Sequence, residues 1–211
     1  NYLLKAKDTN KDQTYFLNQL SSAQLDKVLF PVGRLDKSEV RELATKYGLS
    51  TAEKKDSTGI CFIGERNFRK FLSEYIPMQE GDIKTLDGKV VGKHNGVFYY
   101  TVGQRKGLGI GGGGNGEAWF VVSKDVAKNV LYVSQGDQSM LYHKRLFCEK
   151  FNFITKVPQE NTFECSARIR HRQPEQQAIA TIRDGGLELE FANPQRAIAE
   201  GQYAVIYVGN V

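Results

Sequence analysis

The sequence predicts an α+β protein that is mainly β in its C-terminal two thirds. Apolar residues recur at helical spacing before Pro77 and alternate at strand spacing after it. Short alternating segments separated by turn residues then continue to the end of the chain. At 211 residues the chain is long enough for two domains, or for one domain with a remnant of another.

Helix signals fill the first 77 residues. Three candidate capping boxes precede apolar runs: Asn10 with Gln13, Ser21 with Gln24, and Asp36 with Glu39. The third box opens an apolar stripe at i, i+3, i+4 and i+7, and Gly48 supplies its stop signal. One more helix is expected within residues 67–77, where Pro77 ends it.

Strand signals follow Pro77. Residues 82–93 are a hairpin candidate with Asp87 and Gly88 at the turn. Further strands are expected in 96–103 and 118–136. From about residue 144 onward, short segments recur in a pattern typical of a small closed or nearly closed antiparallel barrel: 146–154, 162–172, 176–183, 187–192 and 202–208.

Composition and charge set broad limits on function. Lys plus Arg number 29 and Asp plus Glu 24, so the net charge of +5 fits nucleic acid or an anionic ligand, although this signal alone is weak. Three cysteines without close spacing argue against a disulfide scaffold and a zinc site, and a reducing cytoplasm is the simplest compartment. No apolar run is long enough to span a bilayer, and no signal peptide is visible.

Cys61 lies between two glycines in the segment DSTGICFIGE, residues 56–65, which fits neither a helix nor a strand. A buried structural thiol is the default for a free cysteine. Here Gly59 and Gly64 allow close approach of the backbone, and nearby lysine and arginine side chains could stabilise a thiolate. No histidine occurs in the segment, so a protease-type Cys–His pair is not indicated.

The segment FECSARIRHRQ, residues 163–173, places three arginines on one face if all of it is a strand. Arg168, Arg170 and Arg172 would then lie about 6.5–7 Å apart. Cys165 would face the other way and belong to the core. Two interpretations of the arginines stay open: a solvated face with salt bridges to glutamates of a neighbouring strand, or a row of cations for an RNA backbone.

Two further segments carry polar groups that could meet RNA. Lys11, Asp12 and Gln13 fit the solvated first turn of a helix, whose N-terminus also attracts phosphate. The segment GQRKGLGIGGGG contains a literal G-x-G-x-x-G, but a strand is expected after it, where a dinucleotide site needs a helix. Its Arg105 and Lys106 belong either to a flexible loop or to a loop that meets RNA or lines a catalytic cleft.

Taken together, these motifs resemble those of the tRNA-specific 2-thiouridylase family. The resemblance rests on STGICFIGERNFRKFL, KDQTYFL, FPVGRLDKSEVRELA, YYTVGQRKGLGIGG and RIRHRQP, which occur in the expected order and cover nearly the whole chain. It implies a sulfurtransferase that replaces the C2 oxygen of the wobble uridine of tRNA with sulfur in an ATP-dependent reaction. Adenylation turns that oxygen into a leaving group, and a cysteine persulfide delivers the sulfur.

Particular residues of this chain match functional positions of the family. The resemblance implies that Cys61 carries the persulfide. It implies tRNA contacts at a larger set of residues: Lys11, Asp12, Gln13, Arg170, His171 and Gln202. Additional candidates for RNA contact are Arg105, Lys106, Arg168 and Arg172. No residue is assigned to a metal ion.

The resemblance also implies a part that this sequence lacks. Members of the family begin with an ATP-pyrophosphatase domain whose Ser-Gly-Gly-x-Asp-Ser loop holds the phosphates, and no such stretch occurs here. ATP, with Mg beside it, and a second cysteine that would take up the remaining sulfur as a disulfide are implied for that domain. The chain begins without Met in a segment that resembles a strand already under way, so we expect a fragment that is inactive alone.

The expected fragment has three parts. Residues 1–57 would be the helical remnant of the α/β nucleotide-binding domain, 58–143 a small mixed central domain that presents Cys61, and 144–211 a β-barrel that binds tRNA. The implied partners are tRNAs for Lys, Glu and Gln, and a cysteine desulfurase or sulfur-relay protein in the cytoplasm. The alternative is a non-catalytic RNA-binding β-barrel module, which has no need of a glycine-flanked cysteine. A methyltransferase is not favoured, because no nucleotide-binding strand–loop–helix is visible.

Overall fold

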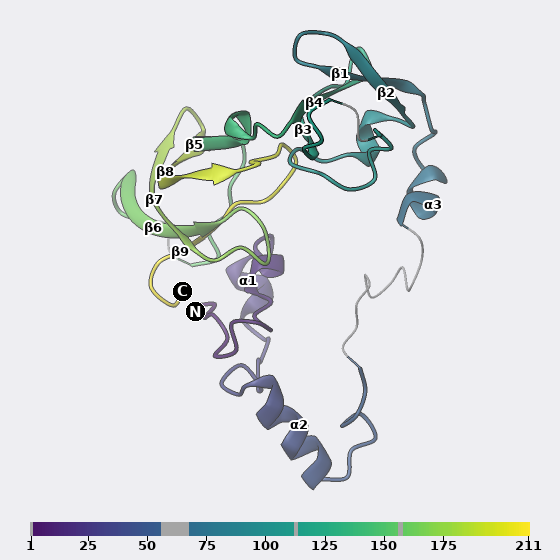
Figure 1. The fold of residues 1–211 in the computed structure, drawn as a ribbon. Helices are drawn as coiled ribbons and strands as arrows, with labels where there is room; N and C mark the ends of the chain where they lie inside the picture. The colour runs from purple at the N-terminus through teal and green to yellow at the C-terminus, as the bar shows by residue number, and fades with distance from the viewer. Residues whose placement is uncertain (1, 56–67, 112–113, 156–157) are drawn as a thin grey trace. The chain divides into compact units, whose positions relative to one another are not determined.

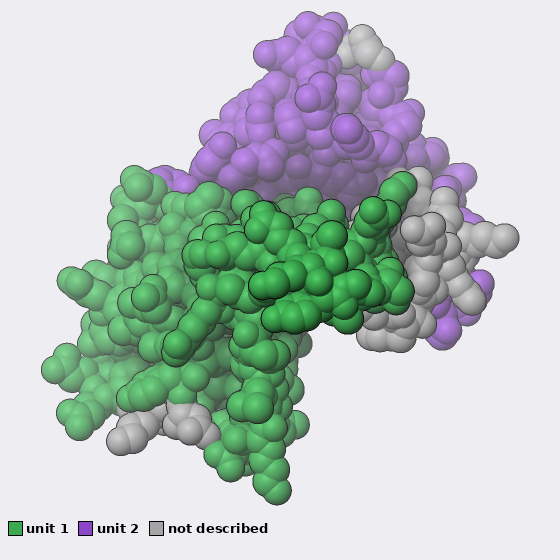
Figure 2. Space-filling view, turned by 90° about the horizontal axis from the view of Figure 1, so that it is seen from below, with its two compact units in different colours: residues 1–56, 144–193, 201–211 green, residues 57–143, 194–200 purple. Residues whose placement is uncertain are grey.

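The computed structural model describes residues 2–55, 68–111, 114–155 and 158–211. The chain forms two compact units, coloured separately in Figure 2. The first, unit 1, comprises residues 1–56, 144–193 and 201–211, and the second, unit 2, comprises residues 57–143 and 194–200. Each unit is therefore assembled from segments that are far apart in the sequence.

Unit 1 begins with three short helical elements: η1 (Thr14–Leu17), α1 (Ser22–Leu25) and α2 (Lys37–Lys46). The predicted capping boxes at Ser21 and Asp36 are confirmed. Each of these side chains accepts the backbone N–H of residue N3, and the N3 side chain accepts the backbone N–H of the N-cap residue. The predicted stop after α2 is also confirmed, since Gly48 adopts a left-handed φ of 65°.

The capping box predicted at Asn10 is wrong. Gln13 is the N-cap of η1 and makes no side-chain capping bond. The carboxylate of Asp12 accepts the N–H of Thr14 in its place. Only a four-residue 3₁₀ helix follows, so the interpretation of this segment as the first turn of an α-helix loses its basis.

Five strands follow that lie wholly or mostly in unit 1 (Figure 1). They are β5 (Tyr142–Cys148), β6 (Thr162–Arg168), β7 (Gln176–Arg183), β8 (Gly186–Arg196) and β9 (Val205–Tyr207), in the sheet order β5-β8-β7-β6-β9. β7 has the predicted bounds, and its two-residue turn into β8 is made by Asp184 and Gly185, both with positive φ.

The predicted mainly β character and antiparallel pairing are confirmed for β6 to β9. The predicted barrel is not closed among the strands that the structure describes, because β5 and β9 stand at opposite edges of the sheet order. A barrel of five strands closes only when the edge strands are long and tilted enough to pair. Here β9 has three residues, and it pairs with β6.

Several strand predictions are wrong in their extent. The strand predicted at residues 146–154 is β5, which ends at Cys148. β6 ends at Arg168 and not at residue 172, because the N–H of Ile169 is turned to the side-chain oxygen of Gln173, and the N–H of Gln173 bonds to the carbonyl of Arg170. These contacts start a turn. Residues 96–103 also form no strand, since they contain the 3₁₀ helix η2 (Val97–Tyr99).

Unit 2 contains a four-stranded sheet with the order β2-β1-β4-β3. Its strands are β1 (Gly81–Thr85), β2 (Val90–His94), β3 (Trp119–Asp125) and β4 (Val130–Gln135), and its helices in the described ranges are α3 (Phe68–Ser73), η2 and η3 (Ser139–Leu141). The predicted hairpin is β1–β2, with Gly88 at a φ of 90° in its turn. β1 and β4 pair in parallel.

The core of unit 2 is apolar and continuous. It consists of buried side chains from the sheet and from the loop that precedes β3: Ile83, Tyr100, Leu108, Val121, Leu131 and Val133. Within the described ranges of the chain, no helix is long and apolar enough to cross a bilayer.

Candidate nucleic-acid interface

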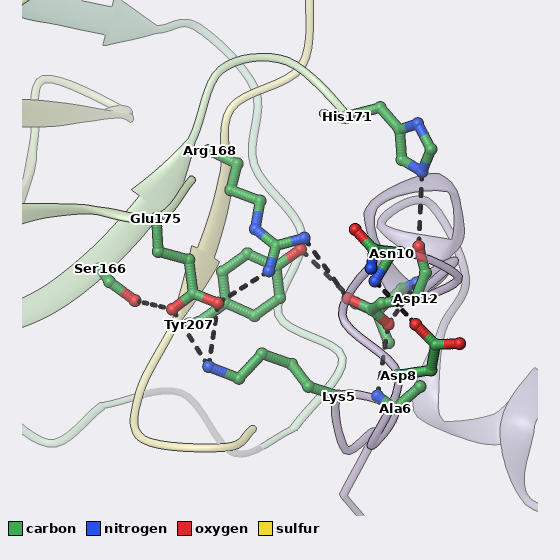
Figure 3. A network of polar contacts seen from close by, with 11 residues as sticks. Lys5, Ala6, Asp8, Asn10, Asp12, Ser166, Arg168, His171, Glu175 and Tyr207 are labelled. Atoms are coloured by element: carbon green, nitrogen blue, oxygen red, sulfur yellow. Dashed lines mark hydrogen bonds and ion pairs between the residues drawn. The ribbon is translucent and has the colours of Figure 1, made fainter. Parts of the chain in front are cut away.

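The N-terminal segment of unit 1 folds around the carboxylate of Asp12 (Figure 3). Asp12 is only 3 % exposed. Its Oδ1 accepts the backbone N–H groups of Ala6 at 3.3 Å and Thr14 at 3.2 Å, and its Oδ2 accepts the Thr14 hydroxyl at 2.8 Å. One buried carboxylate thus organises the turn that carries residues 11–13.

Arg168, the last residue of β6, connects this turn to the sheet. Its guanidinium lies 3.4 Å from Asp12 Oδ2 and 2.9 Å from Glu175 Oε1, and the residue is 8 % exposed. It also lies over the ring of Tyr207 in β9, 5.1 Å from the centroid. Glu175 completes the cluster by accepting hydrogen bonds from Ser166 and Lys5. We call these side chains the polar seam: Lys5, Asp12, Ser166, Arg168, Glu175 and Tyr207.

The polar seam changes the acidity of its own members. Partial burial acts to raise the pKa of Glu175, but the hydrogen bonds from Ser166, Lys5 and Arg168 outweigh it and hold that pKa below its ordinary value. Burial raises the pKa of the Tyr207 hydroxyl. The seam is therefore built for a charged Glu175 and a neutral Tyr207.

A group of aromatic side chains lies beside the polar seam. His171 donates from Nε2 to the carbonyl oxygen of Asp12 at 3.4 Å, and its ring lies 4.4 Å from that of Phe16, centroid to centroid. Tyr15 is buried, meets Phe16 edge-on at 5.5 Å and donates its hydroxyl to the carbonyl of Tyr203. Phe16 itself is 58 % exposed.

The structure brings several predicted site residues to the surface of unit 1. The exposed ones are Lys11, Gln13, Arg170, Arg172 and Gln202. His171, between the two arginines in the sequence, is half-buried. Arg105 and Lys106 are exposed in unit 2, where the side chain of Gln104 binds the carbonyl of Lys106. Cys61 lies outside the described residues.

The predicted row of three arginines is wrong. The strand ends at Arg168, whose side chain turns into the polar seam, so Arg168 belongs neither to a solvated face nor to an exposed row of cations. Asp12 is likewise buried, against the prediction of a solvated first turn. Sequence reasoning missed Glu175, Phe16 and Tyr207. Of these, only Phe16 had a visible signal, as an aromatic residue directly after the polar segment KDQTY.

The other two cysteines are not candidates for chemistry. Cys165 is in the core, as predicted, and burial raises the pKa of its thiol to about 11. Burial also raises the pKa of the Cys148 thiol. A thiol with a raised pKa holds little of the reactive thiolate at neutral pH.

The described residues of the glycine-rich segment, which exclude 112 and 113, lie before β3. The element that follows is thus a strand, as the sequence predicts, where a dinucleotide site needs a helix. Among all the residues that the structure describes, no group of three or more His, Cys, Asp or Glu side chains is placed to hold a metal ion.

Three family models match consecutive parts of this chain. They are the tRNA methyl transferase HUP domain at residues 1–65, the tRNA methyl transferase PRC-barrel domain at 69–135, and the aminomethyltransferase beta-barrel domain at 143–211. Two of the three models are described as tRNA methyl transferase domains, so the matches indicate the class of tRNA-modifying enzymes.

Curated relatives narrow this class. A protein of Listeria welshimeri named tRNA-specific 2-thiouridylase MnmA is 57 % identical over 211 residues, and one of Streptococcus pyogenes with the same name is 54 % identical over 215 residues. Each comparison covers 99 % of this chain, but only 56 % and 57 % of the relatives, so the chain spans about half the length of the curated relatives it matches. The chain belongs to the tRNA-specific 2-thiouridylase family.

Proposed function

We propose that this chain is the sulfur-carrying and tRNA-binding part of an enzyme that thiolates the wobble uridine of tRNA. The observation that carries the proposal is the 57 % identity, over almost the whole chain, to a protein named as a tRNA-specific 2-thiouridylase. The exposed cations of unit 1 support it, because phosphate groups attract such side chains without regard to sequence.

In this proposal unit 1 holds the tRNA. Lys11, Gln13, Arg170, His171 and Gln202 contact the RNA from the surface of the unit. The buried side chains of Asp12 and Arg168 act on it indirectly, because they fix the turn from which Lys11 and Gln13 project. Further contacts are assigned to three exposed side chains: Arg105, Lys106 and Arg172.

Cys61 is the proposed sulfur carrier. Its thiolate attacks the outer sulfur of a persulfide on a cysteine desulfurase or relay protein. The new S–S bond forms on Cys61 while the donor S–S bond breaks, and the donor leaves as a thiolate. The outer sulfur then attacks C2 of the adenylated uridine, and AMP leaves with the former C2 oxygen. A second cysteine, assigned to the nucleotide-binding domain, attacks the inner sulfur of Cys61. The new disulfide forms while the persulfide bond breaks, and the outer sulfur stays on the uridine.

The remaining assignments concern the cofactor, the domains and the substrates. ATP and Mg are assigned to residues other than those described here, so this chain alone does not activate the uridine. Residues 1–57, 58–143 and 144–211 are proposed as the end of the nucleotide-binding domain, the central domain and the tRNA-binding domain. The proposed substrates are cytoplasmic tRNAs for Lys, Glu and Gln, and the proposed enzyme forms a transient disulfide at Cys61.

Intact mass tests the sulfur-carrying role. The chain is mixed with a cysteine desulfurase and free cysteine, and its mass is compared with that of a Cys61→Ala variant. We expect the parent to gain the mass of one sulfur atom, the gain to be reversed by reductant, and the variant to gain nothing. Cys148→Ala is the matched control and should gain sulfur like the parent. A gain that persists in Cys61→Ala would refute the assignment.

Binding of tRNA is tested separately by fluorescence anisotropy. The affinity should fall linearly with salt concentration on a double-logarithmic plot, as phosphate contacts require. Lys11→Ala should lower the slope of that plot by about 1, because one phosphate contact is lost. Lys84→Ala, in β1, serves as the control and should leave the slope unchanged. An affinity that is independent of salt would contradict the proposed role of unit 1.

A further inference from the structure

We propose that the exposed face of the Phe16 ring is a stacking platform for an unpaired nucleobase of the bound RNA. The proposal rests on the proposed function of unit 1 and adds to it a residue and a mode of recognition. It starts from the position of Phe16, which leaves 58 % of its surface exposed while its neighbour Tyr15 is buried. A base stacked on the ring would cover this apolar surface.

The ring of Phe16 is held from two sides. Tyr15 meets it edge-on, with the planes at 90°, and His171 lies against it at 4.4 Å with the planes tilted by 40° (Figure 3 shows His171). Both neighbours are anchored, because Tyr15 donates to the carbonyl of Tyr203 and His171 donates to the carbonyl of Asp12. A ring fixed in this way loses little conformational entropy when a ligand stacks on it.

The anchoring continues into the polar seam. Asp12 accepts two backbone N–H groups of its own turn and pairs with the buried guanidinium of Arg168. The aromatic group is therefore connected to β6 through buried polar contacts. We infer that the seam positions the platform and does not itself touch RNA.

Charge selects the class of ligand. The exposed cationic side chains of Lys11, Arg170 and Arg172 are carried by the same two segments as Phe16 and His171. An aromatic face beside cationic side chains is the combination that binds single-stranded nucleic acid, since the ring stacks on a base and the cations meet the backbone. A base inside a duplex is already stacked on both sides, so the fitting ligand is a base of an unpaired loop.

The test uses the full 211-residue chain and an RNA hairpin with 2-aminopurine in its unpaired loop. Binding is measured for the parent, for Phe16→Leu and for Phe98→Leu. Phe98 is a matched control, because it is also a phenylalanine of a 3₁₀ helix and is 57 % exposed, but it belongs to unit 2. We expect Phe16→Leu to bind roughly 5- to 100-fold more weakly. We expect Phe98→Leu to bind like the parent.

Two further readouts separate stacking from a merely structural role. Stacking quenches 2-aminopurine fluorescence, so binding should quench the parent complex, and Phe16→Trp should restore both the affinity and the quenching that Phe16→Leu loses. The salt slope should be the same for the parent and for Phe16→Leu, because no phosphate contact is removed. Thermal unfolding of each variant shows that unit 1 remains folded.

The outcomes distinguish this inference from the proposed function. If the parent binds RNA with the expected salt slope but Phe16→Leu behaves like Phe98→Leu, the platform is refuted and the proposed function stands. If Phe16→Leu weakens binding of a fully paired duplex as much as binding of the hairpin, the assignment to an unpaired base is refuted. If the parent binds no RNA at all, both proposals fail.

Discussion

Unit 1 and unit 2 are each stabilised internally by a different kind of contact. Unit 2 packs around an apolar cluster whose members come from one stretch of sequence, and Ile83, Val121 and Leu131 in it are fully buried. Unit 1 joins its N-terminal segment to β6 and β9 through the polar seam, in which Arg168 meets an aspartate 156 positions away. An apolar contact can be replaced by another of similar volume. A buried ion pair cannot lose one partner without leaving a charge unpaired.

Removing the arginine of the polar seam should give the largest effect. Arg168→Leu leaves the buried carboxylate of Asp12 without its cation, and we expect unit 1 to lose about 3–5 kcal/mol of unfolding free energy. Urea denaturation measures this loss, and hydrogen exchange at β6 and β9 locates it. In the double variant with Asp12→Asn, part of the loss should be recovered. Strictly additive losses would show that the two side chains do not interact.

A truncation in the core of unit 2 tests the contribution of apolar contacts. Leu131→Ala removes a fully buried side chain from the core cluster, and roughly 2–5 kcal/mol of unfolding free energy should be lost. Because no charge is involved, the loss should be equal at neutral and at acid pH in urea denaturation. A loss that varies with pH would mean that the core of unit 2 also depends on ionised groups.

Acid should weaken the polar seam through Glu175. The pKa of this carboxyl is held below its ordinary value, so its contribution to stability is present above the unfolded value of about 4.3 and is lost as the pH falls through the folded value. The melting temperature of the parent should therefore drop below about pH 4, and that of Glu175→Gln should drop less. If the melting temperatures of the two proteins fall equally with acid, Glu175 does not contribute to the acid sensitivity of unit 1.

A surface ion pair in the same sheet should have the smallest effect. Arg183 and Glu188 lie 2.6 Å apart, but the arginine side chain is 54 % exposed. Arg183→Ala should change the unfolding free energy by less than about 1 kcal/mol, since water and salt screen such a pair. A loss as large as that of Arg168→Leu would contradict the view that burial distinguishes the seam.

Local signals in the sequence were enough to predict much of the fold. The capping boxes at Ser21 and Asp36 depend on residues three positions apart, and β7 depends on alternation within eight residues. The strand predicted at residues 96–103 failed because of a distant partner. The N–H of Gly96 donates to Nδ1 of His94, whose Nε2 donates to the carbonyl of Asn129. The N–H of Val97 donates to the side-chain oxygen of Asn129, so neither N–H is available for a strand.

The candidate site was only partly predictable, for the same physical reason. The segments KDQ and RIRHRQ were identified, but which of their side chains face water depends on partners elsewhere in the chain. Asp12 is buried because Arg168 forms an ion pair with it. β6 ends where the side-chain oxygen of Gln173 accepts the backbone N–H of Ile169. Neither contact leaves a periodic pattern in the sequence. The position of Cys61 lies outside the described residues, so its role remains a prediction.

The distance along the chain between Asp12 and Arg168 also bears on how the protein is made. A ribosome adds about 5–20 residues per second, so roughly 8–30 s pass between the synthesis of the aspartate and that of the arginine. During that interval the N-terminal turn has none of its partners on β6 and β9. It must stay solvated and out of wrong contacts until the last strands of unit 1 emerge. We therefore expect this turn to dock late in biosynthesis, after the sheet of unit 2 has been translated in full.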